Sequence, residues 1–298
     1  MRRFVFRIAW LLLPCVVAAA EPAIFNWEAQ VGGDRVVAFR MWLPDPAQKI
    51  EAVVFVVPGR NGDGRPAAED PEWQGFARRH RCALMACKMQ GADYWSAQDW
   101  SGRYVLQALD EFAKTTSHPE LGTAKMAMWG HSAGGQFSYS FICWRPDRVL
   151  AIVENRGHYI NWEAGPATRR IPALWIAGEK DDPLILEMMG DSFTAGRRGG
   201  APWAFSIDPG AGHEVGRSKE FGILFFEAVF RGREAVNGKP AAAWIGDLRT
   251  HEIQPAATAE PGLQLNNWLP DETFAKEWHA FVTGVPFPSQ EKQTTSAQ

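Results

Sequence analysis

The stretch MAMWGHSAGGQFSYS, residues 126–140, places a serine between a strand-like run and a helix-like run. A very sharp strand-to-helix turn crowds the neighbouring backbone, so the positions two before and two after the turn residue must be small. Gly130 and Gly134 meet that need around Ser132 and give the pattern G-x-S-x-G. This context predicts that Ser132 is exposed at the top of a sheet as a nucleophile. The alternative is that the turn only requires small residues.

Strand-like and helix-like segments alternate on both sides of this stretch. The chain opens with two alternating runs around 32–34, which predict a hairpin. The strand-like runs after it are 51–59, 82–89, 124–130, 148–155, 171–178 and 202–208, and the helix-like runs are 101–114, with Ser101 as its N-cap, 133–144, 184–196 and 219–230. The strand-like runs are almost continuously apolar, as expected for parallel strands covered on both faces. The pattern predicts an α/β protein with a mainly parallel central sheet and helices on both faces.

We expect one domain over 21–288, without a large cap domain. Its C-terminal extension, about 231–288, begins as a loop with no more than one short strand. An amphipathic helix follows at 271–283 and ends at Gly284. The polar residues 289–298 are predicted to be a disordered tail.

The first twenty residues have the pattern of a secretory signal peptide. Three arginines precede a short apolar run that ends at Ala20. The run is shorter than the roughly 20 residues that a membrane span needs, which argues against a stable membrane anchor. Cys15 suggests lipid attachment, but Pro14 before it does not suit a lipoprotein cleavage site. We expect cleavage after Ala20 and a secreted or periplasmic mature chain.

Charge and cysteine content exclude several classes of function. Removal of the signal takes away three arginines and no acid, so the formal net charge changes from −3 to −6, which gives no electrostatic case for binding nucleic acid. Cys82, Cys87 and Cys143 remain, so at most one disulfide forms. Cys82 and Cys87 share one strand-like run, where roughly 16 Å separates their Cα atoms, too far to bridge. No CxxC pair or His/Cys cluster has zinc spacing, so no metal or other cofactor is expected.

A serine nucleophile needs a base, and the base needs a carboxylate to orient it. His213 lies in the Gly-rich loop DPGAGHEVGRS after the last core strand, where sites in open α/β sheets lie. His158 is the second candidate, and His131 is expected to point away from Ser132. The strand IPALWIAG ends in an acidic doublet, in which Asp181 is the better candidate and Asp182 a competitor. Both carboxylates could instead cap the following helix.

The oxyanion of an acyl-transfer intermediate needs two preorganised donors. One is the backbone N–H of Ala133, directly after the nucleophile. The other is expected from the loop PGRNGDGR (58–65), with the N–H of Arg60 favoured and that of Asn61 second. The loop lacks the GxxxxGK[ST] pattern of a phosphate cradle.

These motifs resemble the α/β-hydrolase superfamily. GHSAGG, VPGRNGDG, GEKDD and GAGH occur in its order over roughly residues 50–230, and look most like secreted esterases of the polyhydroxybutyrate-depolymerase, feruloyl-esterase and dienelactone-hydrolase groups. Two positions depart from the pattern: Pro58-Gly59 replaces the common His-Gly, and Arg60 places a large cation where many members carry a smaller or apolar side chain. The resemblance implies the α/β-hydrolase fold and the chain order Ser132, Asp181, His213.

The predicted activity is a secreted serine ester hydrolase that acts through an acyl-enzyme. Tyr94, Trp95 and Trp162 fall in loops expected to face the site, which favours an aryl, carbohydrate-linked or polyester substrate. A serine peptidase of the prolyl-oligopeptidase type would use the same triad, although there is no sequence for its propeller. A non-catalytic protein that binds a polymer or carbohydrate on a hydrolase scaffold is the third possibility.

Overall fold

A computed structural model describes residues 21–157, 163–233, 243–259 and 266–290 of the chain. The expected signal peptide, 1–20, and the site candidates His158 and Trp162 lie outside the described residues. None of the helices in these ranges is both long and apolar enough to cross a membrane.

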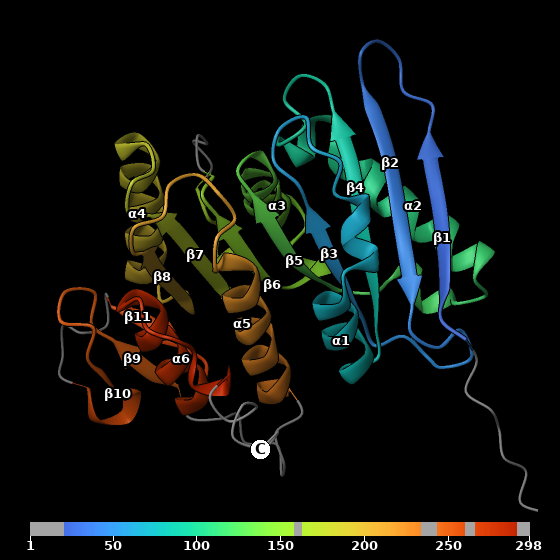
Figure 1. Ribbon diagram of the computed structural model, residues 1–298. Helices are drawn as coiled ribbons and strands as arrows, with labels where there is room; N and C mark the ends of the chain where they lie inside the picture. Colours follow the sequence, from blue (N-terminus) through green and yellow to red (C-terminus); the bar gives the residue numbers. More distant parts are fainter. Residues whose placement is uncertain (1–20, 158–162, 234–242, 260–265, 291–298) are drawn as a thin grey trace, which may run out of the picture.

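An eight-stranded sheet forms the centre of the molecule (Figure 1). The strands are β1 (Ala23–Ala29), β2 (Val36–Leu43), β3 (Ala52–Val57), β4 (Cys82–Gln90), β5 (Met126–His131), β6 (Val149–Asn155), β7 (Ala173–Gly178) and β8 (Trp203–Asp208). They lie in the order β1-β2-β4-β3-β5-β6-β7-β8, with β1–β2 and β2–β4 antiparallel and every later pair parallel. The predicted opening hairpin and mainly parallel sheet are confirmed.

Helices cover both faces of the sheet, as predicted. The helices are α1 (Pro71–Arg79), α5 (Ser218–Arg233) and α6 (Glu272–Val282) on one face and α2 (Gly102–Thr115), α3 (Ala133–Trp144) and α4 (Pro183–Arg198) on the other. Strand β3 explains why two layers are needed, because every one of its side chains is buried. Val53, Phe55 and Val57 face the α2–α3–α4 layer, and the alternate residues face the other layer.

The parallel strands bring several loops to one edge of the sheet. The carboxyl ends of parallel strands share an edge, and ligand sites in open α/β sheets lie there. Strand β3 is followed by the loop that begins at Pro58, and β5 is followed by Ser132. Strand β7 is followed by the segment 179–182, and β8 by the loop 209–217. The topology therefore gathers the residues singled out in the sequence.

Ser101 occupies the N-cap position of α2, as the sequence predicts, but its side chain does not cap the helix. A π-helical turn, Ala97–Ser101, runs directly into the helix, and Ser101 makes no side-chain cap. Its hydroxyl instead donates to the carbonyl oxygen of Tyr94 at 2.5 Å. The serine therefore ties the preceding loop to the helix.

The C-terminal extension forms a second, antiparallel sheet with the order β10-β9-β11. Its strands are β9 (Trp244–Gly246), β10 (Ile253–Pro255) and β11 (Asn267–Leu269). The expectation of no more than one strand was wrong, because strands of three residues are too short to leave a periodic pattern. The predicted helix is confirmed as α6, where Asp271 accepts from the N–H of Phe274 at 2.7 Å.

The extension covers the open edge of β8. An edge strand presents unpaired N–H and C=O groups, which need a partner when they are buried. The side-chain oxygen of Asn267 accepts from the N–H of Phe205, and the Trp278 indole donates to the carbonyl of Phe205 at 3.2 Å. The extension thus supplies a partner to both backbone groups of Phe205 on the open edge of β8.

The predicted boundary of the tail at residue 289 falls slightly too early. The N–H of Ser289 donates to Glu277 at 3.1 Å, and the amide of Gln290 donates to Glu220 at 2.7 Å. The packed chain therefore reaches at least residue 290.

Candidate active site

Ser132 lies at a sharp turn between β5 and α3. Its backbone has φ 55° and ψ −124°, a conformation that is costly for a residue with a side chain. A Cβ atom on Gly130 would lie 2.0 Å from the carbonyl oxygen of Gly134, and one on Gly134 would lie 2.3 Å from that of Val57. Both glycines are therefore required by backbone contacts. The turn that the sequence predicts is present.

A third glycine supports the turn, and the sequence reasoning missed it. A Cβ atom on Gly157, in the loop after β6, would lie 1.9 Å from the carbonyl oxygen of Ser132. The N–H of Ser132 donates to the carbonyl of Asn155 at 2.8 Å. The end of β6 and the chain after it therefore hold the turn, and the glycine two residues after a buried strand was the signal.

The structure brings Ser132, His213 and Asp181 together. The Nε2 atom of His213 lies 2.9 Å from the Oγ of Ser132, and its Nδ1 lies 2.9 and 3.0 Å from the two carboxylate oxygens of Asp181. A carboxylate can only accept, so Nδ1 carries the proton and Nε2 is left to accept from the serine hydroxyl. The Asp181 side chain is 3% exposed and that of His213 is 46% exposed. The acid is enclosed and the imidazole is open to solvent.

The two aspartates that follow β7 have different partners. Asp182 is the N-cap of α4, and its carboxylate accepts from the N–H of Leu184 at 2.9 Å. The Asp181 carboxylate accepts from the N–H of Asp182 at 2.8 Å and otherwise faces His213. Capping therefore accounts for Asp182 alone, and the geometry favours Asp181 over its competitor as the partner of the imidazole.

His131 makes no hydrogen bond to Ser132 among the described contacts, and its ring lies beside that of His213. Its ring lies 5.4 Å from that of His213, centroid to centroid, and its Nδ1 lies 2.9 Å from the amide nitrogen of Asn155. An amide nitrogen only donates, so Nδ1 is an acceptor and the imidazole is neutral. Burial, together with the neighbouring His213, lowers the pKa of His131 to about 4. A neutral ring therefore packs beside the imidazole of His213.

The two candidate oxyanion donors belong to Ala133, which follows Ser132, and Arg60, which follows the glycine that contacts it. Ala133 is the first residue of α3, so its N–H has no acceptor within the helix. Arg60 follows Gly59, where a Cβ atom would lie 3.4 Å from the Cβ of Ser132. Within the described residues, the N–H of Arg60 donates to no protein acceptor. Both donors are therefore available beside the hydroxyl.

The aromatic residues predicted to contact substrate have different environments. Tyr94 is 1% exposed, and its hydroxyl donates to the carbonyl of Pro58 at 3.0 Å. In contrast to the expectation, it has no surface to offer a substrate and instead anchors the loop 58–65. Trp95 is half-buried, with the guanidinium of Arg60 5.6 Å from its ring centroid. Trp162 lies outside the described residues.

A buried ion pair that the sequence reasoning missed holds the histidine loop. Arg156 follows β6 and donates to the carboxylate of Asp208, at the end of β8, at 2.7 Å. Their side chains are 0% and 4% exposed. The same guanidinium donates to the carbonyls of Glu214 and Val215, the latter at 2.9 Å. The pair therefore fixes the backbone directly after His213. The sequence feature that could have indicated this pair is the arginine directly after the strand-like run 148–155.

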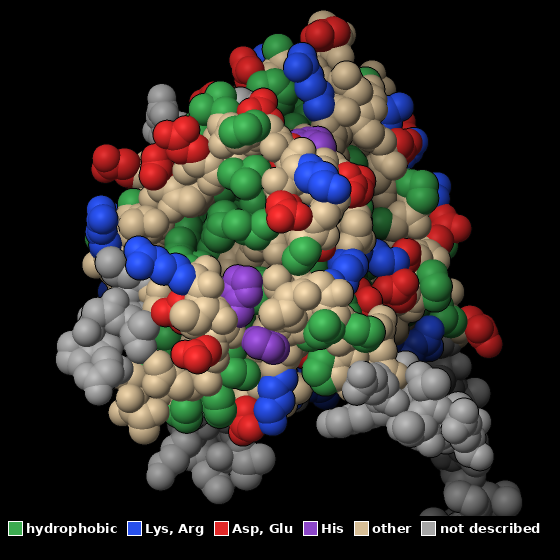
Figure 2. Space-filling view, turned by 60° about the vertical axis from the view of Figure 1, so that its left-hand side comes forward, with side chains coloured by type: hydrophobic (Ala, Val, Ile, Leu, Met, Phe, Trp, Pro, Cys, Tyr) green, Lys and Arg blue, Asp and Glu red, His purple; other side chains and the backbone are tan. Residues whose placement is uncertain are grey.

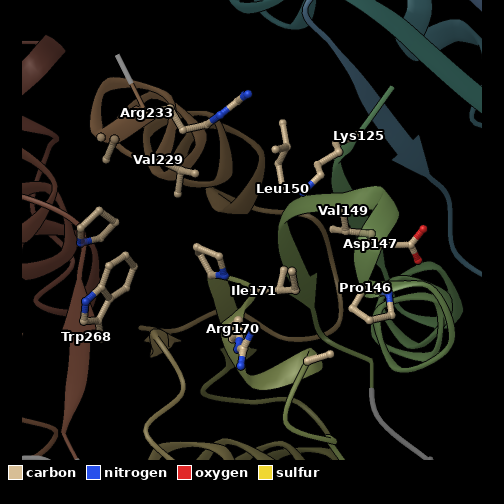
Figure 3. A pocket seen from close by; sticks show the side chains of 15 residues that line it. Lys125, Pro146, Asp147, Val149, Leu150, Arg170, Ile171, Val229, Arg233 and Trp268 are labelled. Atoms are coloured by element: carbon tan, nitrogen blue, oxygen red, sulfur yellow. The ribbon is translucent and has the colours of Figure 1, made fainter. Parts of the chain in front are cut away.

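Two cavities elsewhere in the molecule are not lined by this triad. One of about 680 Å³ (Figure 3) lies among the residues before β5, β6 and β7, including Lys125, Asp147 and Ile171, and is bordered by Trp268 and Arg233. These are the amino ends of the strands, and a six-residue strand spans roughly 20 Å. The cavity therefore lies at the opposite edge of the sheet from Ser132.

The second cavity, of about 420 Å³, lies between α4, β8 and α6. Its lining includes Phe193, Ile207, Leu248 and His251. Apolar side chains gather on the face of the molecule that carries these elements, with histidines beside them (Figure 2). The lining reaches Glu179 and Pro209, so this cavity adjoins the loops that carry Asp181 and His213.

The described residues hold no cluster of three or more His, Cys, Asp and Glu side chains arranged for a metal ion. In the same part of the chain, Cys82, Cys87 and Cys143 form no disulfide. Burial raises the pKa of the Cys87 thiol well above its usual value and that of Cys143 to about 11, so neither is a thiolate at neutral pH.

Comparison with solved structures identifies the architecture. No protein-family model and no curated protein matches the sequence. A ferulic acid esterase superposes on 70% of this chain and 98% of its own, with a TM-score of 0.55 and 13% identity. An S-formylglutathione hydrolase from Staphylococcus aureus superposes on 72% of this chain and 98% of its own, with a TM-score of 0.51 and 12% identity. A poly(3-hydroxybutyrate) depolymerase from Bordetella parapertussis superposes on 71% of this chain and 88% of its own, with a TM-score of 0.50 and 17% identity. The chain has the α/β-hydrolase fold.

This hydrolase fold confirms the resemblance found in the sequence. Its structural neighbours are esterases and related hydrolases, and two carry names from the groups expected. Identities this low establish the arrangement of strands and helices, and a fold hosts many reactions. The chemistry must therefore be argued from the side chains around Ser132.

The buried pair gives a prediction for stability. Arg156→Met leaves the Asp208 carboxylate buried without its cation, which is expected to cost about 3–5 kcal/mol of unfolding free energy. In the Arg156→Met/Asp208→Asn variant no charge remains unpaired, so its loss should be smaller than the sum of the two single losses. Urea unfolding of the four proteins measures this coupling. Strictly additive losses would show that the two side chains do not act as a pair.

The lowered pKa of His131 gives a prediction for pH dependence. A histidine whose pKa is lower in the folded than in the unfolded chain stabilises the fold above the unfolded value, about 6.5, and this contribution is lost as the pH falls towards 4. Between pH 6.5 and 4, the unfolding free energy of the wild-type protein should therefore fall more steeply than that of His131→Gln, which keeps an acceptor for Asn155. The difference in slope should be up to about 1.4 kcal/mol per pH unit.

Urea midpoints at half-unit pH intervals measure this change. His279→Gln, which removes an exposed histidine that donates to the carbonyl of His251, is the matched control. An unchanged pH slope in His131→Gln would show that His131 is not held neutral.

Proposed function

We propose that the chain is a secreted or periplasmic serine ester hydrolase with Ser132 as nucleophile, His213 as base and Asp181 as the acid that orients it. The observation that carries this proposal is the unbroken series of hydrogen bonds from the Asp181 carboxylate through the imidazole to the Ser132 hydroxyl. A serine without such a base is a poor nucleophile at neutral pH. The location rests on the signal-like residues 1–20.

In the first half of the cycle, the Ser132 Oγ attacks the ester carbonyl carbon as His213 Nε2 takes the hydroxyl proton. The carbonyl oxygen becomes an oxyanion that accepts from the N–H groups of Ala133 and Arg60. Asp181 stabilises the imidazolium without taking its proton. The intermediate then collapses, the C–O bond to the alcohol breaks, and His213 gives the proton to the departing oxygen.

In the second half, water releases the acyl group. His213 takes a proton from water as the water oxygen attacks the acyl-enzyme carbonyl. The same two N–H groups stabilise the second oxyanion. Its collapse breaks the bond to Ser132 and returns the proton from His213 to the serine oxygen, so the enzyme ends in its starting state.

The substrate is proposed to be an ester with an aryl, carbohydrate-linked or polymeric part. The exposed imidazole of His213 suits a site open to bulky substrates, and the half-buried Trp95 offers a ring face. Structural neighbours are named for ferulic acid and poly(3-hydroxybutyrate). A peptidase would use the same triad, and a non-catalytic binder would not need it. The choice of an ester over an amide rests on the resemblance of the motifs around Ser132, Asp181 and His213 to those of secreted esterases, and the comparison of esters with anilides below tests it.

Ser132→Ala tests the nucleophile. Without the hydroxyl no acyl-enzyme forms, so kcat on 4-nitrophenyl acetate and butyrate should fall at least about 10⁴-fold. Comparison with the matching 4-nitroanilides separates an esterase from a peptidase. Ser138→Ala, which removes a buried hydroxyl in α3 that donates to Gly134, is a matched control for loss of a serine. Near-wild-type turnover in Ser132→Ala would contradict the mechanism, and the absence of any turnover by the wild-type protein would favour a binding protein.

The two adjacent aspartates give a sharper test of the triad. Asp181→Asn leaves the imidazole without its orienting carboxylate and should lower kcat about 10⁴-fold. Asp182→Asn keeps a side-chain oxygen for the N-cap of α4 and should change kcat only slightly. Kinetics of the two variants on one ester measure the difference. The reverse order would assign the acid to Asp182.

A further inference from the structure

We propose that Arg60 and Trp95 form a carboxylate-binding subsite beside Ser132, so that the preferred substrate is an ester that also carries a carboxylate. The inference rests on the proposed function and narrows its substrate class. Three observations carry it: the backbone of Arg60 starts next to Ser132, the guanidinium lies against Trp95, and no acidic side chain of the described residues pairs with it.

The backbone at Arg60 is fixed next to the nucleophile. The preceding residue, Gly59, approaches Ser132 so closely that a Cβ atom there would lie 3.4 Å from the serine Cβ. The Tyr94 hydroxyl holds the carbonyl of Pro58 at 3.0 Å, and Gln90 holds that of Asn61 at 3.0 Å. The loop is therefore anchored on both sides of Arg60, and the guanidinium projects from a fixed point beside the reacting atoms.

The guanidinium itself rests on Trp95. Its central carbon lies 5.6 Å from the centroid of the ring. The loop of Trp95 is held in turn, because the Ser140 hydroxyl donates to the Trp95 carbonyl at 2.6 Å and accepts from the N–H of Ala97 at 2.9 Å. This attraction to the ring face uses none of the N–H donors in a hydrogen bond to another side chain, so they remain available to a ligand.

Arg60 has no acidic partner among the described residues, in contrast to its neighbour in the loop. Arg65 donates to the carboxylate of Asp63 at 2.7 Å and has a second acid, Glu28, at 3.3 Å. A planar guanidinium with unused donors matches a carboxylate in two parallel hydrogen bonds. The exposed cation directly after Gly59, whose backbone contacts Ser132, is thus the one left available.

The substrate that fits this arrangement is a half-ester of a dicarboxylic acid, or an ester whose alcohol carries the carboxylate. Two pairs of esters separate these sources of charge. The first pair is mono-4-nitrophenyl adipate and 4-nitrophenyl hexanoate, which differ by a carboxylate on the acyl side. The second is 3-carboxyphenyl acetate and phenyl acetate, which differ on the alcohol side.

Arg60→Gln should lower the ratio of kcat/KM for the charged ester to that for the neutral ester by about tenfold to a hundredfold in at least one pair. Arg60→Lys should retain part of the preference, because it keeps the charge but loses the planar fork. Arg65→Gln removes the same charge from the same loop and should leave the ratio unchanged. High salt should weaken the wild-type preference, since the subsite is exposed.

The outcomes separate this inference from the proposed function. An unchanged ratio for Arg60→Gln in both pairs, with Ser132-dependent hydrolysis intact, would overturn the subsite and leave the esterase standing. If no ester is hydrolysed, calorimetric binding of mono-4-nitrophenyl adipate decides. Ser132→Ala/Arg60→Gln should bind it at least tenfold more weakly than Ser132→Ala, and equal affinities would overturn the subsite.

Discussion

The structure around the site depends on one steric constraint, the close backbone packing at Ser132. A Cβ atom on Gly134 would lie 2.3 Å from the carbonyl oxygen of Val57, and one on Gly157 would lie 1.9 Å from that of Ser132. A Cβ atom on Gly130 would lie 2.0 Å from the carbonyl oxygen of Gly134. Strands β3, β5 and β6 can therefore approach one turn from three sides. This packing holds the serine in an uncommon backbone conformation and presents its hydroxyl at the carboxyl edge of the sheet. Any side chain at these glycines would push the turn away from its neighbours.

The remaining parts of the site are loops brought to that edge by parallel topology and then fixed individually. The loop 58–65 is held by Tyr94, and the loop that carries His213 is held by the buried Arg156–Asp208 pair. The neutral His131 packs beside the imidazole of His213. At the far side of the fold, the C-terminal extension pairs the open edge of β8 through Asn267 and Trp278. The candidate site is concentrated in loops, and buried polar contacts to the strands fix the positions of these loops.

Much of this arrangement was predictable because its signals are local. Apolar runs and the spacing of Gly130, Ser132 and Gly134 predicted the sheet and the turn, and chain order predicted that His213 and Asp181 reach the same edge. Partners distant in sequence were not predictable, because hydrophobic periodicity does not indicate which buried arginine pairs with which aspartate, as Arg156 does with Asp208. The three-residue strands of the extension were missed for lack of length. Tyr94 was misplaced because an aromatic residue in a loop has the same local pattern whether it is buried or exposed.

The central claim, that this packing makes Ser132 the nucleophile, is tested most directly by covalent labelling. The folded wild-type protein is incubated with an excess of an alkyl fluorophosphonate, and the intact mass and the labelled peptide are measured. The account predicts one adduct per chain, on Ser132, because the hydroxyl is activated by His213 and the oxyanion donors stabilise the tetrahedral adduct. An unlabelled Ser132 in a folded protein, or labelling of another serine in its place, would contradict it.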